Sequence, residues 1–132
     1  MKKLNPLLIC LLLMVTYSCR SGPIHIEDDL SPMELIQKAQ EASDRNRLND
    51  AIQFYQAIID RFPSDIDSIC AAEYEIAFIH YKQGNYDIAK EGFNNLLARY
   101  NEPDAALLPQ QFRVLSNIVL ERMDEIEASR RR

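Results

Sequence analysis

After residue 30, apolar residues recur at intervals of three and four positions through most of the chain. This spacing predicts amphipathic helices, and no strand pattern appears. Within residues 48–62, for example, Ala51, Tyr55, Ile58 and Phe62 share one helical face. We expect five helices, over residues 32–44, 49–62, 66–83, 86–100 and 107–128.

Capping and turn residues set these boundaries. Ser31-Pro32-Met33-Glu34 is a capping box with proline at the first helical position, so the first helix is expected to begin there. Pro63 is expected to end the second helix. Asn46 and Gly84 are the residue types that best tolerate the left-handed conformation of a tight turn between helices.

The helical segments repeat after 38 residues. Residues 48–62 (LNDAIQFYQAIIDRF) align with residues 86–100 (YDIAKEGFNNLLARY) when the sequence is shifted by that interval. Because the shift preserves core residues and turn chemistry together, it indicates two copies of one helix pair stacked as a solenoid. The aligned pairs include Ala39 with Ala77, Asn46 with Gly84, Ala51 with Ala89, Tyr55 with Phe93, and Arg61 with Arg99.

These positions resemble the tetratricopeptide repeat family. The second copy carries its signature in Ala77, residues 81–86 (YKQGNY), Ala89, Phe93 and Leu97, and the first copy matches through Leu35, Ala39, Ala51, Tyr55, Ile58 and Pro63. Two positions depart from the family pattern. Glu73 replaces a bulky apolar residue, and Asn101 replaces the closing proline, with Pro103 two residues later.

The resemblance implies an all-α fold: a short helical-repeat solenoid of two tetratricopeptide-like helix pairs and a C-terminal capping helix. The expected domain covers residues 31–128, with repeats at about 32–65 and 70–103 and the capping helix at about 107–128. The longer repeat, with Arg-Phe-Pro-Ser-Asp before the next helix pair, is similar to repeats of bacterial envelope lipoproteins, among them the outer-membrane-assembly tetratricopeptide subunit.

The resemblance also implies a binding groove. In this family the first helix of each pair lines a concave surface that holds a peptide or a partner helix. Rigid aromatic side chains would anchor such a partner, and Lys82 would pair with a carboxylate. The alternative is that Tyr74 and Phe78 only pack against the first helix pair. The expected groove residues are Tyr74, Phe78, Tyr81, Lys82, Ile36 and Gln40.

An apolar stripe follows the second repeat. Phe112, Leu115, Val119, Met123 and Ile126 lie on one face of the helix expected over residues 107–128. We interpret this as a closing helix that covers the second repeat, because two repeats alone fall short of the three normally needed. The alternative is a homo-oligomer in which Phe112, Leu115, Val119 and Met123 seat a second copy. Residues 129–132 (SRRR) are expected to form a frayed basic tail.

The beginning of the chain predicts export. Lys2 and Lys3 precede an apolar run at residues 7–15, which is too short to span a bilayer as a helix and has the layout of a signal peptide over residues 1–18. Ser18-Cys19 resembles a bacterial lipoprotein signal, in which the cysteine is acylated and becomes the mature N-terminus. This implies a membrane anchor in the envelope, with inner and outer membranes not distinguished.

Two features of this region leave alternatives. Thr16 and Tyr17 depart from the lipoprotein pattern, so ordinary cleavage before Cys19, giving an exported protein without lipid, stays open. Residues 19–30 (CRSGPIHIEDDL) show no helical period and predict a flexible tether. Fully extended, the tether would reach about 40 Å.

Composition excludes several functions. Removal of the signal leaves a net charge of −7 without a basic cluster before the tail, which disfavours nucleic-acid binding. Three glycines supply no phosphate-binding loop, and two distant histidines make no metal site, so we expect no cofactor and no metal. Cys70 has no cysteine partner in the domain and is expected to be a buried apolar residue.

No pattern predicts catalysis, because no serine or cysteine nucleophile has a base at a recognisable spacing. The sequence therefore predicts a non-enzymatic, membrane-anchored binding module that docks an envelope protein or peptide. A self-associating structural subunit is the alternative.

Overall fold

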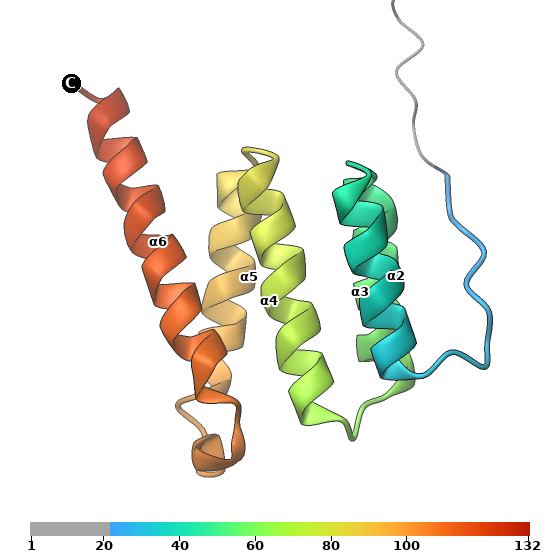
Figure 1. Ribbon diagram of the computed structural model, residues 1–132. Coiled ribbons are helices and arrows are strands. Elements are labelled where there is room, and N and C mark those ends of the chain that lie inside the picture. Colours follow the sequence, from blue (N-terminus) through green and yellow to red (C-terminus); the bar gives the residue numbers. More distant parts are fainter. Residues whose placement is uncertain (1–21) are drawn as a thin grey trace, which may run out of the picture.

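The computed structural model describes residues 22–132 as an array of helices that run alternately up and down (Figure 1). The elements are α2 (Pro32–Asp44), α3 (Leu48–Arg61), α4 (Ile66–Lys82), α5 (Tyr86–Arg99), the 3-10 helix η2 (Ala105–Leu107) and α6 (Gln110–Arg130). No strand occurs in residues 22–132. The fold is all-α, with two helix pairs, α2–α3 and α4–α5, and the closing helix α6. This confirms the predicted fold class.

The predicted start and turn residues act locally as expected. The Ser31 side chain accepts a hydrogen bond from the Glu34 backbone N–H, and the Glu34 carboxylate accepts one from the Ser31 N–H, which completes the capping box. The hydrogen bonds from Ser31 lower the pKa of Glu34. Asn46 has a φ of 57° and Gly84 a φ of 78°, so both turns use the left-handed conformation.

Residues 22–30 are attached to the first helix pair along α3. The Ile24 N–H donates to the Gln53 side chain at 3.0 Å. The Arg61 guanidinium donates to the backbone carbonyl of Glu27 at 2.7 Å and to that of Ile26 at 3.3 Å. These contacts orient the segment parallel to α3 and antiparallel to α2, as the blue trace in Figure 1 shows.

This attachment corrects the flexible tether for the part of it that is described. Ile26 and Leu30 pack against the apolar core of the first helix pair. A segment without helical period can still dock through its backbone groups and two apolar side chains. We refer to residues 22–30 as the docked strap. Residues 1–21, which include the predicted signal peptide and Cys19, lie outside the described part of the chain.

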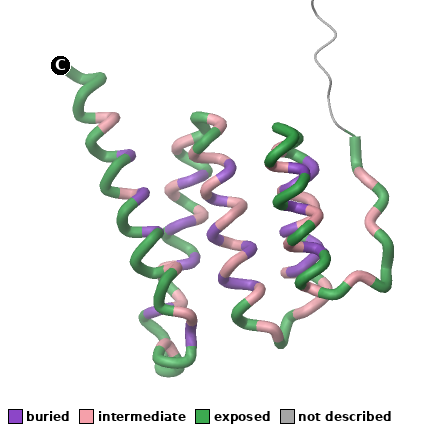
Figure 2. Tube along the Cα trace, in the orientation of Figure 1, coloured by how far each residue is buried: buried purple, intermediate pink, exposed green. Residues whose placement is uncertain are grey.

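Two apolar clusters meet at α4 (Figure 2). The first cluster joins α2 and α3 to one face of α4, which contributes Ala72 and Ile79. The second joins another face of α4 to α5 and α6, with Phe93, Leu96 and Met123 fully buried. Because α4 belongs to both clusters, it links the two helix pairs.

The closing helix is displaced along the chain from its prediction: it begins at Gln110 and not at residue 107, and residues 105–107 form the separate 3-10 helix η2. The closing helix continues through Arg130, whose guanidinium lies over the Tyr86 ring at 5.3 Å from the ring centroid. The predicted frayed tail is therefore wrong for residues 129 and 130. At the other end of α6, the Tyr100 hydroxyl donates to the Pro109 carbonyl at 2.8 Å, which fixes the connection from α5.

Candidate partner-binding site

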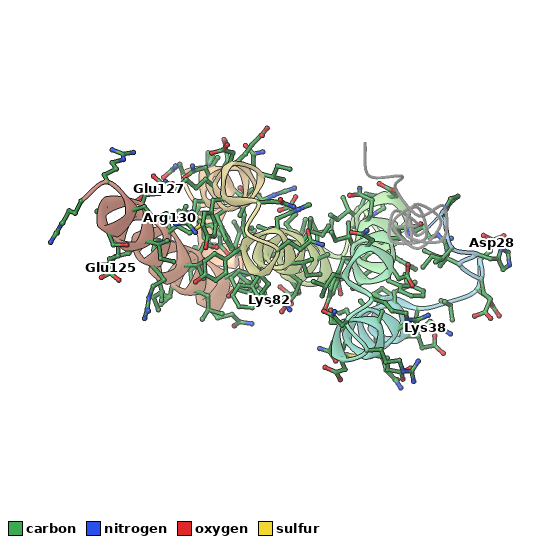
Figure 3. The ribbon with its side chains drawn as sticks, turned by 90° about the horizontal axis from the view of Figure 1, so that it is seen from above. Asp28, Lys38, Lys82, Glu125, Glu127 and Arg130 are labelled. Carbon is green, nitrogen blue, oxygen red and sulfur yellow. The ribbon has the colours of Figure 1, made fainter. Side chains whose placement is uncertain are left out.

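The first helices of the two pairs, together with α6, form one side of the molecule. Viewed from above, α2, α4 and α6 lie on the opposite side from α3 and α5, and Lys82 projects from α4 away from α5 (Figure 3). Side chains of these three helices and of the residue before α6 line a cavity of about 320 Å³. We call this side the groove face. The residues that line the cavity are Ile36, Asp67, Ser68, Ala71, Pro109, Gln111 and Phe112.

The predicted groove residues have different environments. Ile36 is half-buried and lines the cavity, and Gln40, one turn along α2, is exposed. Phe78 is half-buried and Lys82 is exposed, with the Lys82 ammonium 5.4 Å from the centroid of the Phe78 ring. These four residues are available to a partner, and the binding role predicted for them stays a prediction.

Tyr74 is not available, because it belongs to the core. It is 7% exposed, and its ring packs against Phe78, Phe93 and Phe112 at centroid distances of 5.6–5.8 Å. Burial raises the pKa of the Tyr74 hydroxyl. Tyr74 therefore packs in the core, as the alternative predicted, but the rings that it contacts belong to α4, α5 and α6 and not to the first helix pair.

Tyr81 lies between the core and the groove face. Its ring contacts Phe78 on one side and Tyr86 on the other, at 5.7 and 5.8 Å between centroids. With Tyr74 these residues form a continuous aromatic row across α4 and the start of α5. Each ring packs against a neighbouring ring, which restricts its movement. The row therefore forms a rigid apolar surface on the groove face beside Phe78.

The polar groups on this side of α4 carry opposite charges at its two ends. Asp67 lines the cavity near the start of α4, and Lys82 is the last residue of the helix. Glu75 is half-buried between them, and desolvation raises the pKa of its carboxyl, although the charge of Lys82 opposes the shift. The arrangement can hold an extended segment through apolar contacts and can orient it by charge.

The face formed by α3, α4 and α5 carries a second cavity, which the sequence did not predict. Its volume is about 370 Å³, and its walls include Ile59, Ile76 and Ile88. The bidentate pair between Arg99 and Glu73, with N–O distances of 2.6 and 2.9 Å, borders it. This ion pair explains why Glu73 departs from the repeat pattern, in which a bulky apolar residue is usual. The carboxylate lies where Arg99 of α5 can reach it.

The apolar stripe of α6 faces the second repeat, as the closing-helix interpretation predicts. Val119 and Met123 are buried and Phe112 is half-buried, all within the core formed with α4 and α5. Val119 and Met123 are therefore unavailable to a second copy, which corrects that part of the homo-oligomer alternative, whereas Phe112 also lines the cavity of the groove face. Leu115 is 40% exposed, because it lies at the edge of the buried face.

A different set of apolar residues is exposed on α6. Val114 and Ile118 are 54% and 56% exposed and lie one turn apart on either side of Leu115 in sequence. The heptad-like spacing favours burial of residues 112, 115, 119 and 123, whereas the structure buries Ser116 in place of Leu115. A small rotation of α6 about its own axis therefore determines which of its apolar side chains are buried and which are exposed.

The described residues show no reactive or metal-binding group. Cys70 is fully buried, and desolvation raises the pKa of its thiol, so it packs as an apolar residue. Within residues 22–132, no three histidine, cysteine or carboxylate side chains are grouped to hold a metal ion. No helix in this part of the chain combines the length and apolar character needed to cross a membrane.

Comparisons with known proteins agree with this architecture. The chain is 31% identical over 109 residues to an uncharacterised protein of Treponema pallidum (strain Nichols); the match covers 81% of this chain and 44% of that relative. The chain therefore spans less than half the length of that protein. No solved structure gives a significant match. Residues 71–101, from α4 to the end of α5, match the tetratricopeptide repeat family. This match supports a tetratricopeptide repeat protein with a protein-interaction role, and it indicates no catalytic family.

Proposed function

We propose that this chain is a non-enzymatic tetratricopeptide repeat lipoprotein that acts as a membrane-anchored adaptor for protein partners in the bacterial envelope. The observation that carries the proposal is the groove face, where Phe78 and Lys82 flank a side of α4 that no other described element covers. The adjoining cavity between α2, α4 and α6 adds apolar area from Ile36 and Phe112.

The chemistry of this face fits an extended peptide or a partner helix. Apolar side chains of the partner would contact Ile36 and Phe78, and an acidic group would pair with Lys82. Asp67 at the other end of α4 would favour a basic residue of the partner, so the groove face would fix the direction of the bound segment.

Site-specific photo-crosslinking in intact cells tests this role. A photoreactive residue at Gln40, which is exposed beside the groove face, should capture a distinct envelope protein. The matched control is Asn94, which is exposed on α5 and points away from that face. Equal capture at both positions, or capture at Asn94 alone, would place the partner elsewhere and would contradict the proposal.

The anchor has a separate support and a separate test. The apolar run at residues 7–15 followed by Ser18-Cys19 favours acylation of Cys19, which would raise the local concentration of partners at the membrane. The intact mass of the protein isolated from membranes should contain acyl chains on Cys19. A mature chain without added mass would instead favour the exported, non-lipidated alternative.

Self-association is a second candidate, because Val114, Leu115 and Ile118 expose a patch of apolar surface on α6. Under this alternative, the chain from residue 19 onward forms a dimer that Ile118→Asp disrupts. Sedimentation at tens of micromolar distinguishes the two candidates. A monomer in that range would exclude the self-associating subunit and leave the adaptor.

A further inference from the structure

The two ends of the helical array differ in charge. One end contains the α2–α3 turn, the α4–α5 turn and the last turn of α6, all at the top of Figure 1. We call it the turn edge and define it as residues 44–48, 82–87 and 128–132. These residues include six bases and two acids. The bases are Arg45, Arg47, Lys82, Arg130, Arg131 and Arg132.

Some of these bases have acidic neighbours one turn further in. Arg45 lies 3.8 Å from Glu41, and Arg47 lies 3.6 Å from Asp50. Both arginine side chains nevertheless remain more than half exposed, at 65% and 53%. The guanidinium groups are therefore accessible to a charged surface at the turn edge, and the carboxylates that balance them lie one turn deeper.

The opposite end of the array is acidic. It comprises residues 27–34, 60–67 and 99–104, which together include nine acids and two bases. Both bases are already paired, since Arg61 binds the docked strap and Arg99 binds Glu73. An anionic surface would repel this end and attract the turn edge, so the charge distribution defines a preferred orientation.

The docked strap approaches the turn edge. Its contacts run from Arg61, near the end of α3, to Gln53, in the first half of that helix. The chain therefore travels toward the turn edge as it is followed back to residue 22, as the blue segment in Figure 1 shows. Two residues, 20 and 21, separate Cys19 from the strap, so the chain from Cys19 to residue 22 reaches at most about 10 Å.

From these observations we infer that the turn edge binds the surface of an anionic lipid bilayer and orients the domain on it. This inference rests on the proposed anchor at Cys19. The short connection holds the turn edge within about a Debye length of the lipid headgroups, roughly 10 Å at 0.1 M salt, where its arginines are attracted most strongly. The helices then stand upright on the bilayer, and the groove face opens sideways with its acidic end farthest from the lipid.

Chemical anchoring to vesicles tests the orientation without depending on lipidation in the cell. The chain from residue 19 onward is coupled through Cys19 to a maleimide lipid, a reaction from which the buried Cys70 is protected. A fluorescent donor is placed at Ala128, on the turn edge, or at Ala106, near the opposite end, and an acceptor is placed on the lipid headgroups. Both positions are exposed.

On vesicles containing phosphatidylglycerol, energy transfer from Ala128 should exceed that from Ala106 about two-fold or more, because Ala106 lies before α6 and residues 110–128 of that helix rise about 27 Å. Equal transfer from both positions, or stronger transfer from Ala106, would overturn the inference. A failure of acylation or of crosslinking in cells would leave this result unchanged, so the two proposals fail separately.

A triple variant tests whether charge causes the orientation. Arg45→Gln, Arg47→Gln and Arg131→Gln together should reduce the excess transfer from Ala128, as should phosphatidylcholine vesicles or high salt. The matched control is Lys38→Gln, Arg113→Gln and Arg122→Gln, which removes the same charge outside the turn edge. If both triple variants behave alike, net charge rather than the turn edge sets the orientation, and the inference is wrong.

Discussion

Gly92 is the residue at which two helices of the second repeat approach most closely. A Cβ at this position would lie 2.9 Å from the Cβ of Ala77, closer than two carbon atoms pack. Glycine within a helix costs about 1 kcal/mol relative to alanine, so the close contact of α4 with α5 must offset that cost. The close approach of Ala77 gives the physical reason for a glycine at this position.

We expect Gly92→Ala to lower the free energy of unfolding by about 1–2 kcal/mol, because the overpacking exceeds the gain in helix propensity. Urea denaturation followed by circular dichroism measures the change. The compensating variant Gly92→Ala/Ala77→Gly removes the clash and should recover most of the loss. Stabilisation by Gly92→Ala alone would show that α5 can move away from α4 without cost.

The stability of the domain depends on pH through the carboxyl group of Glu75. Because burial raises the pKa of its carboxyl, the folded state binds a proton there more tightly than the unfolded chain does. The contribution of Glu75 is therefore most favourable below the unfolded-state pKa of about 4.3 and is lost as the pH rises through the folded pKa. At neutral pH the charged carboxylate reduces stability.

Glu75→Gln should consequently stabilise the domain at pH 7, by an amount of the order of 1 kcal/mol or less, and the gain should shrink toward zero at pH 4. Urea denaturation at a series of pH values between these limits checks the prediction. Arg113→Gln, an exposed charge change on α6, serves as the control and should show no such trend. A loss of stability in Glu75→Gln at pH 7 would mean that attraction to Lys82 outweighs the burial.

At the scale of the element, α6 depends on polar contacts in its second half. The Lys90 ammonium of α5 lies 2.9 Å from Asp124 and 2.8 Å from Glu127. Figure 3 shows Glu127 and Arg130 between α6 and α5, while Glu125 points away. The hydrogen bonds that Lys90 donates to Glu127 and Asp124 raise the pKa of the lysine, so at high pH this interaction is lost only when the lysine loses its proton.

Lys90→Gln should therefore increase amide hydrogen exchange in residues 124–130 while residues 112–119, which are held by core contacts, keep their protection. Exchange measured by mass spectrometry on overlapping peptides resolves the two halves of α6. Arg122→Gln removes an exposed pair within α6 and is the matched control. Unchanged exchange in residues 124–130 would show that Met123 and Ile126 alone hold this half of the helix.

The same helix shows what the sequence could and could not predict. Periodicity, capping residues and the 38-residue repeat were sufficient to place the five described α-helices to within three residues at each end, but not the 3-10 helix η2. The exact rotation of α6 was not predictable, because Leu115 and Ser116 are adjacent and the apolar pattern favours burying leucine. Packing against Tyr74 and Phe93 decides the rotation instead, and those contacts join residues distant in sequence.

Long-range contacts also limited the prediction of the candidate site. Phe78, Lys82, Ile36 and Gln40 could be placed on the groove face from their helical spacing alone. Tyr74 could not be assigned to the core in that way, because it shares their helix and is buried only by the arrival of α6. The docked strap was missed for a similar reason, since its binding depends on Arg61, 34 residues away from Glu27.

For the whole molecule, the central question is whether the two apolar clusters unfold together. Ala72 and Ile79 of α4 belong to the first cluster, while Cys70 and Ala77 of the same helix belong to the second. Separate unfolding would require α4 to be folded against one cluster and exposed on the other. Two helix pairs that share a helix in this way should form one cooperative unit.

We therefore expect variants in either cluster to shift a single transition. Ile58→Val in the first cluster should cost about 0.5–1.5 kcal/mol, and Met123→Ala in the second should cost about 2–5 kcal/mol. Both side chains are fully buried, whereas Val114 is exposed and Val114→Ala should change stability by less than about 0.5 kcal/mol. In urea, hydrogen exchange of α2 and of α6 should report the same midpoint as circular dichroism for each variant. A midpoint for α6 that falls in Met123→Ala while that for α2 stays in place would show that α4 does not couple the two helix pairs.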